Sequence, residues 1–125
     1  MVDVAGLSDR LIEAYNAKDF TALSAMIVPD LDFAHFNRDF VLTSREALIE
    51  VLKGFANTYA PDRHFERPER VSVVGNIVIR EAWYAGTAAV DLPGFGAAGE
   101  AFRFKFCSVM RFNDDGLLVE WKDHG

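Results

Sequence analysis

The stretch "AFRFKFCSVMRFNDDGLLVEWKD", residues 101–123, contains two segments in which apolar and polar side chains alternate. Because successive side chains of a strand point to opposite faces, the alternation predicts strands at 101–112 and 117–123, each with one apolar face. The tetrapeptide "NDDG" at 113–116 has the composition of a hairpin turn. One face of the last strand is expected to carry Leu117, Val119, Trp121 and Asp123. The predicted antiparallel hairpin therefore ends its apolar stripe on an acid, Asp123.

The segments before this hairpin predict further strands. A short strand at 71–74 is followed by a Gly75-Asn76 turn and by a long strand from Ile77 to about Val90. A glycine-rich loop at 91–100 then leads into the hairpin. The second half of the chain is thus expected to form an antiparallel sheet.

The first half of the chain is predicted to be mostly helical. Ser8 is a candidate N-cap for a first helix, and a shorter second helix over 20–27 is expected to end before Pro29. A short strand is expected at 31–36.

A longer helix follows this strand. The tetrapeptide "TSRE" at 43–46 has the form of a capping box and predicts a helix through about Thr58. Its apolar stripe consists of Ala47, Leu48, Val51, Leu52 and Phe55. Helices first and antiparallel strands afterwards define an α+β fold, and the length predicts one domain over residues 1–125.

The composition argues against several classes of function. The net charge of -6, with no cluster of Lys or Arg, argues against a nucleic-acid partner. No apolar run approaches the length of a membrane span, and the N-terminus lacks the regions of a signal peptide, so we expect a cytoplasmic protein. A single Cys107 excludes a disulfide-built fold. The three scattered His residues form no metal-binding motif, and the "GFGAAG" loop does not lead into a helix, so we expect no metal and no cofactor.

The order of the predicted elements resembles that of the nuclear transport factor 2-like superfamily. This superfamily includes SnoaL-like polyketide cyclases, ketosteroid isomerases, scytalone dehydratases and limonene epoxide hydrolases. The resemblance covers nearly the whole chain and rests on "AYNAKDFTALSAMIVPDLDF" near its start and "RFNDDGLLVEWKDHG" at its end. It implies a sheet curled into a cone against the helices, an apolar pocket in the mouth of the cone, and a homodimer formed through the sheet.

The members of the superfamily imply different site residues. Trp121-Lys122-Asp123 resembles the last-strand motif of limonene epoxide hydrolases, but Ala82 and Tyr84 stand where that group has an Arg and its first Asp. The three catalytic positions of ketosteroid isomerases are occupied here by His35, Leu11 and Ser108. Neither catalytic set is therefore complete.

Two other groups in the superfamily match more loosely. Tyr15-Asn16 resembles the Tyr-Asp pair of scytalone dehydratases, His35 falls at their first-strand Tyr, and His64 in "DRHF" resembles one of their pocket His residues. SnoaL-like cyclases use an Asp and a His as acid and base, and this match is the least contradicted.

Four residues are candidates for proton transfer. Burial of Asp123 beside Trp121 is expected to raise its pKa toward neutrality and make it a general acid or base; the alternative is a solvated charge close to the end of the chain. His64 and His35 are candidate proton-transfer partners of Asp123. The alternatives are that His64 is a surface residue and that His35 is a core residue. Tyr15 is a candidate donor to a substrate oxygen, or a core aromatic residue.

The predicted pocket walls are mainly aromatic. Residues expected to bind substrate are Phe55, Trp83, Phe102, Phe104, Phe106, Ser108, Met110 and Trp121. Glu81 shares a face with Ile77, Ile79 and Trp83, so it is either a buried acid or the sign of a bulge.

The leading hypothesis is a cofactor-independent isomerase, cyclase or dehydratase that acts on a small apolar cyclic carbonyl or hydroxyl compound. Asp123 and one histidine would exchange the proton, and Tyr15 would hold the polar end of the substrate. The second hypothesis is a non-catalytic ligand-binding or dimerisation module. The third is epoxide hydrolysis, which would gain support if Glu81 faced Asp123 across the pocket and replaced the missing acid.

Overall fold

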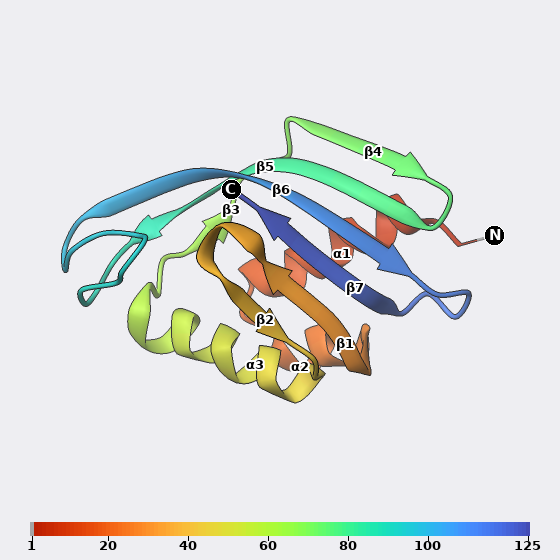
Figure 1. Ribbon diagram of the computed structural model, residues 1–125, viewed down its shortest axis with the longest axis horizontal. Helices are drawn as coiled ribbons and strands as arrows, with labels where there is room; N and C mark the ends of the chain where they lie inside the picture. The colour runs from red at the N-terminus through yellow and green to blue at the C-terminus, as the bar shows by residue number, and fades with distance from the viewer. Residues whose placement is uncertain (1) are drawn as a thin grey trace.

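The predicted hairpin forms the middle of a curved sheet in the computed structural model, which describes residues 2–125 (Figure 1). Strands β6 (Ala101–Phe112) and β7 (Leu118–His124) pair in antiparallel register, and β5 (Ile77–Thr87) pairs with the other edge of β6. On the far side of β7, strand β1 (Ile27–His35) runs parallel to it. This parallel pairing joins the N-terminal and C-terminal parts of the chain.

Short strands complete the sheet at its edges. The strand order is β2-β1-β7-β6-β5-β3, where β2 is Phe40–Leu42 and β3 is His64–Phe65, and β4 (Arg70–Val74) also pairs with β5. A single 3-10 turn, η1 (Phe36–Arg38), connects β1 to β2.

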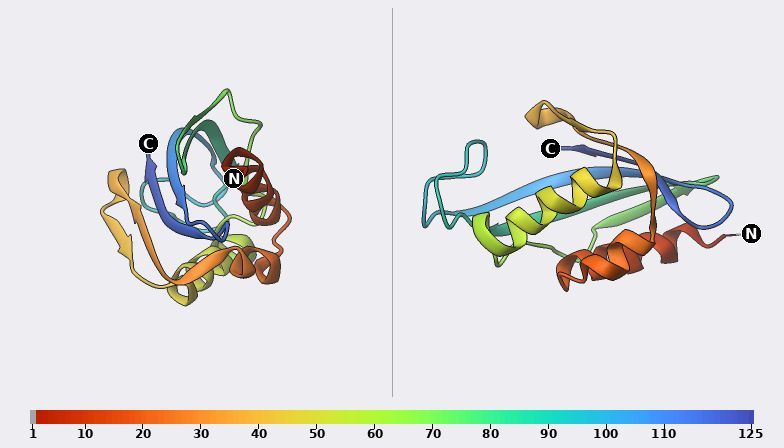
Figure 2. Two further views of the ribbon diagram at one scale, coloured as in Figure 1. Left: turned by 90° about the vertical axis from the view of Figure 1, so that its right-hand side faces the viewer. Right: turned by 90° about the horizontal axis from the view of Figure 1, so that it is seen from below.

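The helices cover one face of the sheet, and the sheet bends around them (Figure 2). They are α1 (Val4–Asn16), α2 (Phe20–Ala25) and α3 (Arg45–Gly54), and α3 continues into a π-helical turn, η2 (Phe55–Tyr59). The core lies between the two layers, where fully buried Leu11 and Leu48 of the helices pack with Met110 and Trp121 of the sheet. The predicted α+β cone is confirmed.

The last strand contains an irregularity that the sequence pattern did not predict. The pairing of β7 with β6 shifts between Arg111 and Phe112, so that Phe112 pairs with Leu118 while Arg111 pairs with Glu120. The extra residue is Val119, and Leu118 is fully buried in its place. The expectation that Val119 faces inward is therefore wrong, because a bulge reverses the alternation at the start of the strand.

Several predicted boundaries are displaced. Asp3, not Ser8, caps α1, and Ser8 is a buried residue inside that helix. Strand β1 begins at Ile27 and includes Pro29; its pairing with β7 is interrupted between Ile27 and Asp32, so Pro29 falls where no regular ladder is needed.

Two further boundaries moved by a few residues. The α3 cap is Ser44, one residue after the start of the predicted capping box at Thr43, and β5 ends at Thr87 before the expected Val90.

In residues 2–125, no helix is long and apolar enough to cross a membrane.

The Ser44 cap fixes the start of the helix that forms one wall of the cavity. Its Oγ accepts a hydrogen bond of 3.0 Å from the backbone N–H of Ala47. Replacement by Ala leaves this amide without its partner, so we expect Ser44→Ala to lower the free energy of unfolding by about 1 kcal/mol. Urea denaturation measures this change. Ser44→Asp, which restores an acceptor, should recover most of the loss, and equal losses in both variants would contradict the capping role.

Candidate active site

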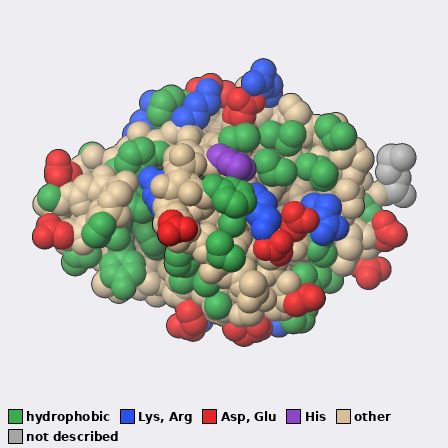
Figure 3. Space-filling model, in the orientation of Figure 1, with side chains coloured by type: hydrophobic (Ala, Val, Ile, Leu, Met, Phe, Trp, Pro, Cys, Tyr) green, Lys and Arg blue, Asp and Glu red, His purple; other side chains and the backbone are tan. Residues whose placement is uncertain are grey.

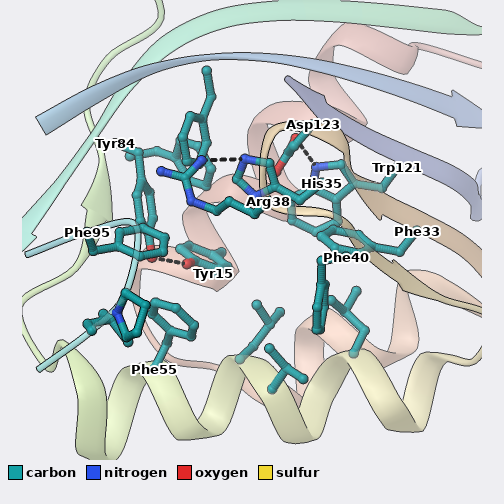
Figure 4. A pocket seen from close by; sticks show the side chains of 17 residues that line it. Tyr15, Phe33, His35, Arg38, Phe40, Phe55, Tyr84, Phe95, Trp121 and Asp123 are labelled. Atoms are coloured by element: carbon teal, nitrogen blue, oxygen red, sulfur yellow. Dashed lines mark hydrogen bonds between the residues drawn. The ribbon is translucent and has the colours of Figure 1, made fainter. Parts of the chain in front are cut away.

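A cavity of about 250 Å³ lies between the inner face of the sheet and α3 (Figure 4). Its polar atoms come from five residues: Tyr15 of α1, His35 of β1, Arg38 of η1, Tyr84 of β5 and Asp123 of β7. The rest of the lining is apolar, namely Phe33, Phe40, Leu48, Val51, Leu52, Phe55, Phe65, Leu92, Pro93, Phe95, Phe106 and Trp121. Such a surface suits a ring compound with few polar groups.

Asp123 lies at the inner end of β7, as its position in the alternation predicts. It is 4% exposed, and its Oδ1 accepts a hydrogen bond of 2.8 Å from Nε1 of Trp121, two residues earlier on the same face. Burial raises the pKa of the carboxyl group to about 6, and hydrogen bonds from Ser108 and Trp121 and the charge of Arg38 only partly oppose this rise. Asp123 therefore exchanges its proton close to neutral pH.

His35 lies directly beside Asp123, because the parallel pairing of β1 with β7 puts these two residues in register. Its Nε2 is 3.0 Å from Nη1 of Arg38, and a guanidinium group can only donate. Nε2 must therefore accept, which leaves the ring neutral with its proton on Nδ1. Burial and the charge of Arg38 agree with this assignment, since they lower the pKa of His35 to about 4.

Two tyrosines place hydroxyl groups at the opposite side of the cavity (Figure 4). The Oη atoms of Tyr15 and Tyr84 are 2.8 Å apart and buried, so one hydroxyl donates to the other and the donor of the second remains for a ligand. Burial raises the pKa of Tyr15 to about 12 and that of Tyr84 well above its usual value, so both are neutral donors at physiological pH.

Only some of the residues predicted to bind substrate line the cavity. Phe55, Phe106 and Trp121 line the cavity. Ser108 is buried beside Asp123 and reaches its carboxylate. The others that point inward, Phe102, Phe104 and Met110, belong to the core around the cavity rather than to its lining.

Two predicted positions are wrong, and the open question of Glu81 is answered. His64 is exposed on β3, where its Nδ1 contacts the Asp62 carbonyl oxygen, and it does not line the cavity. Trp83 points to the outer face of the sheet, where its indole N–H donates to Glu69. Glu81 shares that outer face and forms an ion pair with Arg70. The even-numbered residues of β5 face inward. A pocket role for Trp83 required the odd-numbered residues to face inward instead.

Arg38 and Tyr84 were not predicted as site residues. Arg38 lies in the η1 turn, which has no periodic pattern, and only the fold brings it over the cavity. The alternation of β5 offered a signal for Tyr84, because a strand with Trp83 outside has Tyr84 inside. In residues 2–125, no group of three or more His, Cys, Asp or Glu side chains is arranged to hold a metal ion.

A model of the SnoaL-like domain family matches residues 9–121, so the chain belongs to this family. The resemblance to the nuclear transport factor 2-like superfamily is thereby confirmed. A search of curated protein sequences finds no match to the chain.

Solved structures agree on the fold. A candidate polyketide cyclase from Pseudomonas putida has a TM-score of 0.84 and 15% identity, covering 100% of this chain and 92% of its own. IdmH, a candidate polyketide cyclase from Streptomyces antibioticus, has a TM-score of 0.78 and 22% identity, covering 98% and 91%. An LEH-like epoxide hydrolase from M. tuberculosis has a TM-score of 0.76 and 17% identity, covering 97% and 80%. At these identities the likeness shows the fold alone.

The raised pKa of Asp123 has a consequence for stability. The folded protein holds this proton up to about pH 6, whereas the unfolded chain releases it near 3.8, so folding becomes less favourable as pH rises between these values. The penalty above pH 6 is about two pKa units at about 1.4 kcal/mol each, or about 3 kcal/mol. We therefore expect Asp123→Asn to increase the free energy of unfolding at pH 8.

Urea denaturation at pH 8 and near pH 4 measures this effect. The gain should be largest at pH 8 and should be small near pH 4, where Asp123 is protonated in the folded state and about half protonated in the unfolded chain. A gain that does not depend on pH would mean that the folded-state carboxyl group titrates normally.

Proposed function

We propose that the protein is a cofactor-independent acid–base enzyme that moves a proton next to the carbonyl or hydroxyl group of a small apolar cyclic compound. The observation that carries this proposal is the position of Asp123: a buried carboxyl group, with its pKa raised to about 6, faces a cavity lined mainly by apolar side chains. An unpaired acid in such a place reduces stability, and a group that exchanges protons near neutral pH is what general base catalysis requires.

The base in this proposal is Asp123 and not His35. The Nε2 lone pair of His35 is occupied by Arg38, and the ring stays neutral down to a pKa of about 4. His35 is therefore a positioning residue that fills the space beside the carboxylate and fixes Arg38.

The tyrosine pair supplies the complementary group. The Asp123 carboxylate removes a proton from the carbon next to the substrate carbonyl. The electron pair of the broken C–H bond forms the C=C bond of an enolate, and the π pair of the carbonyl bond moves onto its oxygen. The enolate oxygen accepts a hydrogen bond from the Tyr15–Tyr84 pair, which holds the developing charge. Asp123 then returns the proton to a different carbon in an isomerisation, or to the alkoxide formed when the enolate attacks a second carbonyl in a cyclisation.

The other hypotheses have less support. Epoxide hydrolysis would have gained support from a Glu81 side chain that faced Asp123, but Glu81 lies on the outer face of the sheet and is paired with Arg70. The hypothesis of a non-catalytic binding module places the ligand in the same cavity and predicts binding without turnover. A proton-exchange experiment therefore distinguishes this hypothesis from that of an enzyme.

The experiment is hydrogen–deuterium exchange of 2-tetralone in D₂O, followed by proton NMR. We expect the protein to accelerate loss of the signal of the protons next to the carbonyl. The rate should rise as pH increases toward 6 and level off above it, because the carboxylate is the active form. Asp123→Asn should reduce the rate on the order of a hundredfold or more.

Asp32→Asn is the matched control, because Asp32 is a solvent-exposed acid on β1 whose carboxylate is paired with Lys122. It should exchange the ketone at the wild-type rate. Binding of 2-tetralone without any acceleration by the wild-type protein would favour the non-catalytic module.

We also propose that the chain forms a homodimer through the outer face of the sheet. This face carries half-buried Ile77, Ile79 and Trp83 of β5 among ion-paired charges, beside exposed Val74 of β4. On the side of the molecule drawn in Figure 3, hydrophobic side chains gather in the region of these strands. Light scattering should therefore give twice the chain mass.

A charge in the middle of this surface should separate the subunits. Ile79→Glu is expected to give a monomer, whereas Val71→Glu, on the other face of β4, should remain dimeric. A monomeric wild-type protein would refute the dimer.

A further inference from the structure

Arg63 is a buried cation for which the proposed function has no role. It lies between η2 and β3, is 2% exposed, and none of its three guanidinium nitrogens has a hydrogen-bond partner in residues 2–125. Its guanidinium carbon lies 4.0 Å from the centre of the Tyr15 ring. Burial of an unpaired charge is costly, so a side chain retained in this state indicates a requirement for positive charge at this place.

The other buried arginine of the sheet region shows what an ordinary structural role looks like. Arg80 is 5% exposed, and its Nη1 donates to Ser8 and to the carboxylate of Asp9. Arg63 has no such carboxylate within ion-pair distance among the described residues. The neighbouring Asp62 accepts instead from the backbone and hydroxyl of Thr87.

A second arginine lies close to the tyrosine pair from the cavity side. The guanidinium carbon of Arg38 lies 4.4 Å from the ring centre of Phe95 and 5.4 Å from that of Phe106. Its Nη atoms contact His35 and main-chain oxygens, but its Nε is buried without a partner. Like Arg63, it forms no ion pair with a side-chain carboxylate in residues 2–125.

The charged and titratable groups around the tyrosine hydroxyls include a cation without an anionic partner in residues 2–125, Arg63. They are Arg63 before β3, Arg38 of η1, neutral His35 of β1, and Asp123 of β7, while Asp62 and His64 point outward beside Arg63. Asp123 supplies one negative charge when it is ionised, and Nη1 of Arg38 donates to the main-chain oxygen of Gly125, so Arg63 is the arginine here whose guanidinium nitrogens all lack a partner in residues 2–125. Arg63 favours negative charge on the tyrosine pair, since it lowers the pKa of Tyr15 and Tyr84 against the effect of burial. Arg38 interacts with the charge of Tyr84 in the same sense, because Tyr84 opposes the lowering of the Arg38 pKa by burial.

We propose that Arg63, acting with Arg38, makes the Tyr15–Tyr84 pair a binding site for an ionised oxygen, so that the ligand is an apolar ring compound with an acidic hydroxyl, bound as its phenolate or enolate. Arg63 is a positioning residue in this site: it does not line the cavity and acts through the Tyr15 ring that it covers. The inference rests on the proposed function in that it places the ligand in the same cavity, but it concerns binding and requires no turnover.

The test uses 4-nitrophenol, whose absorbance distinguishes its neutral and ionised forms, and 4-nitroanisole, which has nearly the same shape but cannot ionise. We expect wild-type protein at pH 8 to bind 4-nitrophenol at least tenfold more tightly than 4-nitroanisole. The bound phenol should also ionise at lower pH than the free phenol. Equal affinities, or no binding of either compound at millimolar concentration, would overturn the proposal.

Arg63→Met then separates an electrostatic role from a structural one. Met retains the apolar bulk, so the variant should fold, and we expect its unfolding temperature to equal or exceed that of the wild type. Its preference for 4-nitrophenol should fall by tenfold or more, which corresponds to at least one pKa unit for the bound phenol. Arg67→Met, which removes the same charge from an exposed arginine, should leave the preference unchanged.

Two further variants make the result decisive. Arg63→Lys retains the charge and should retain most of the preference even if packing is imperfect, and a Lys variant that loses it as completely as Met would contradict an electrostatic role. Asp123→Asn should still prefer 4-nitrophenol, because the arginines remain. A wild-type protein that prefers 4-nitrophenol but does not accelerate ketone exchange would count against the proposed catalysis alone, and a wild-type protein that accelerates exchange without this preference would count against the anion site alone.

Discussion

The parallel pairing of β1 with β7 is the interaction on which the rest of the site depends. These strands lie at opposite ends of the sequence, and their register places His35 beside Asp123. His35 then engages Arg38, which follows it in the η1 turn. One strand pairing thus positions three of the five polar groups of the cavity, while the neighbouring β6 supplies Ser108 next to the carboxylate.

The inner face of the sheet shows how much the alternation of apolar and polar residues along a strand can predict. The alternation in β6 and the end of β7 correctly predicted that Phe106, Trp121 and Asp123 face inward, because a pleated strand leaves no other choice. The same rule failed at Val119, where a bulge shifts the phase, and bulges have no reliable signature in a single sequence. In β5, both faces carry large apolar residues, so the pattern alone did not decide between Trp83 and Tyr84.

The remaining site residues depended on tertiary structure. Arg38 and Arg63 lie in connections without a periodic pattern. The sequence around such an arginine does not distinguish a solvated side chain from a buried one. His64 was placed in the site by resemblance, but the short β3 pairs at the edge of the sheet and leaves its ring in solvent. Tyr15 entered the cavity because α1 packs across the sheet near Tyr84, which also determines the hydrogen bond between their hydroxyls.

The π-helical turn at the end of α3 gives the cavity a way to change over evolutionary time. The amide of Ala60 donates to the carbonyl of Phe55, five residues earlier, so this turn holds one more residue than an α-helical turn would. Phe55 opens the turn and lines the cavity. Loss of a single residue here would restore regular helix and rotate the side chains that follow, while the capped start of α3 stayed in place. Because the Phe55 ring packs edge-on against Tyr59 of the same turn, a one-residue length change here would alter the support of a cavity-lining ring without any change in the sheet that carries Asp123.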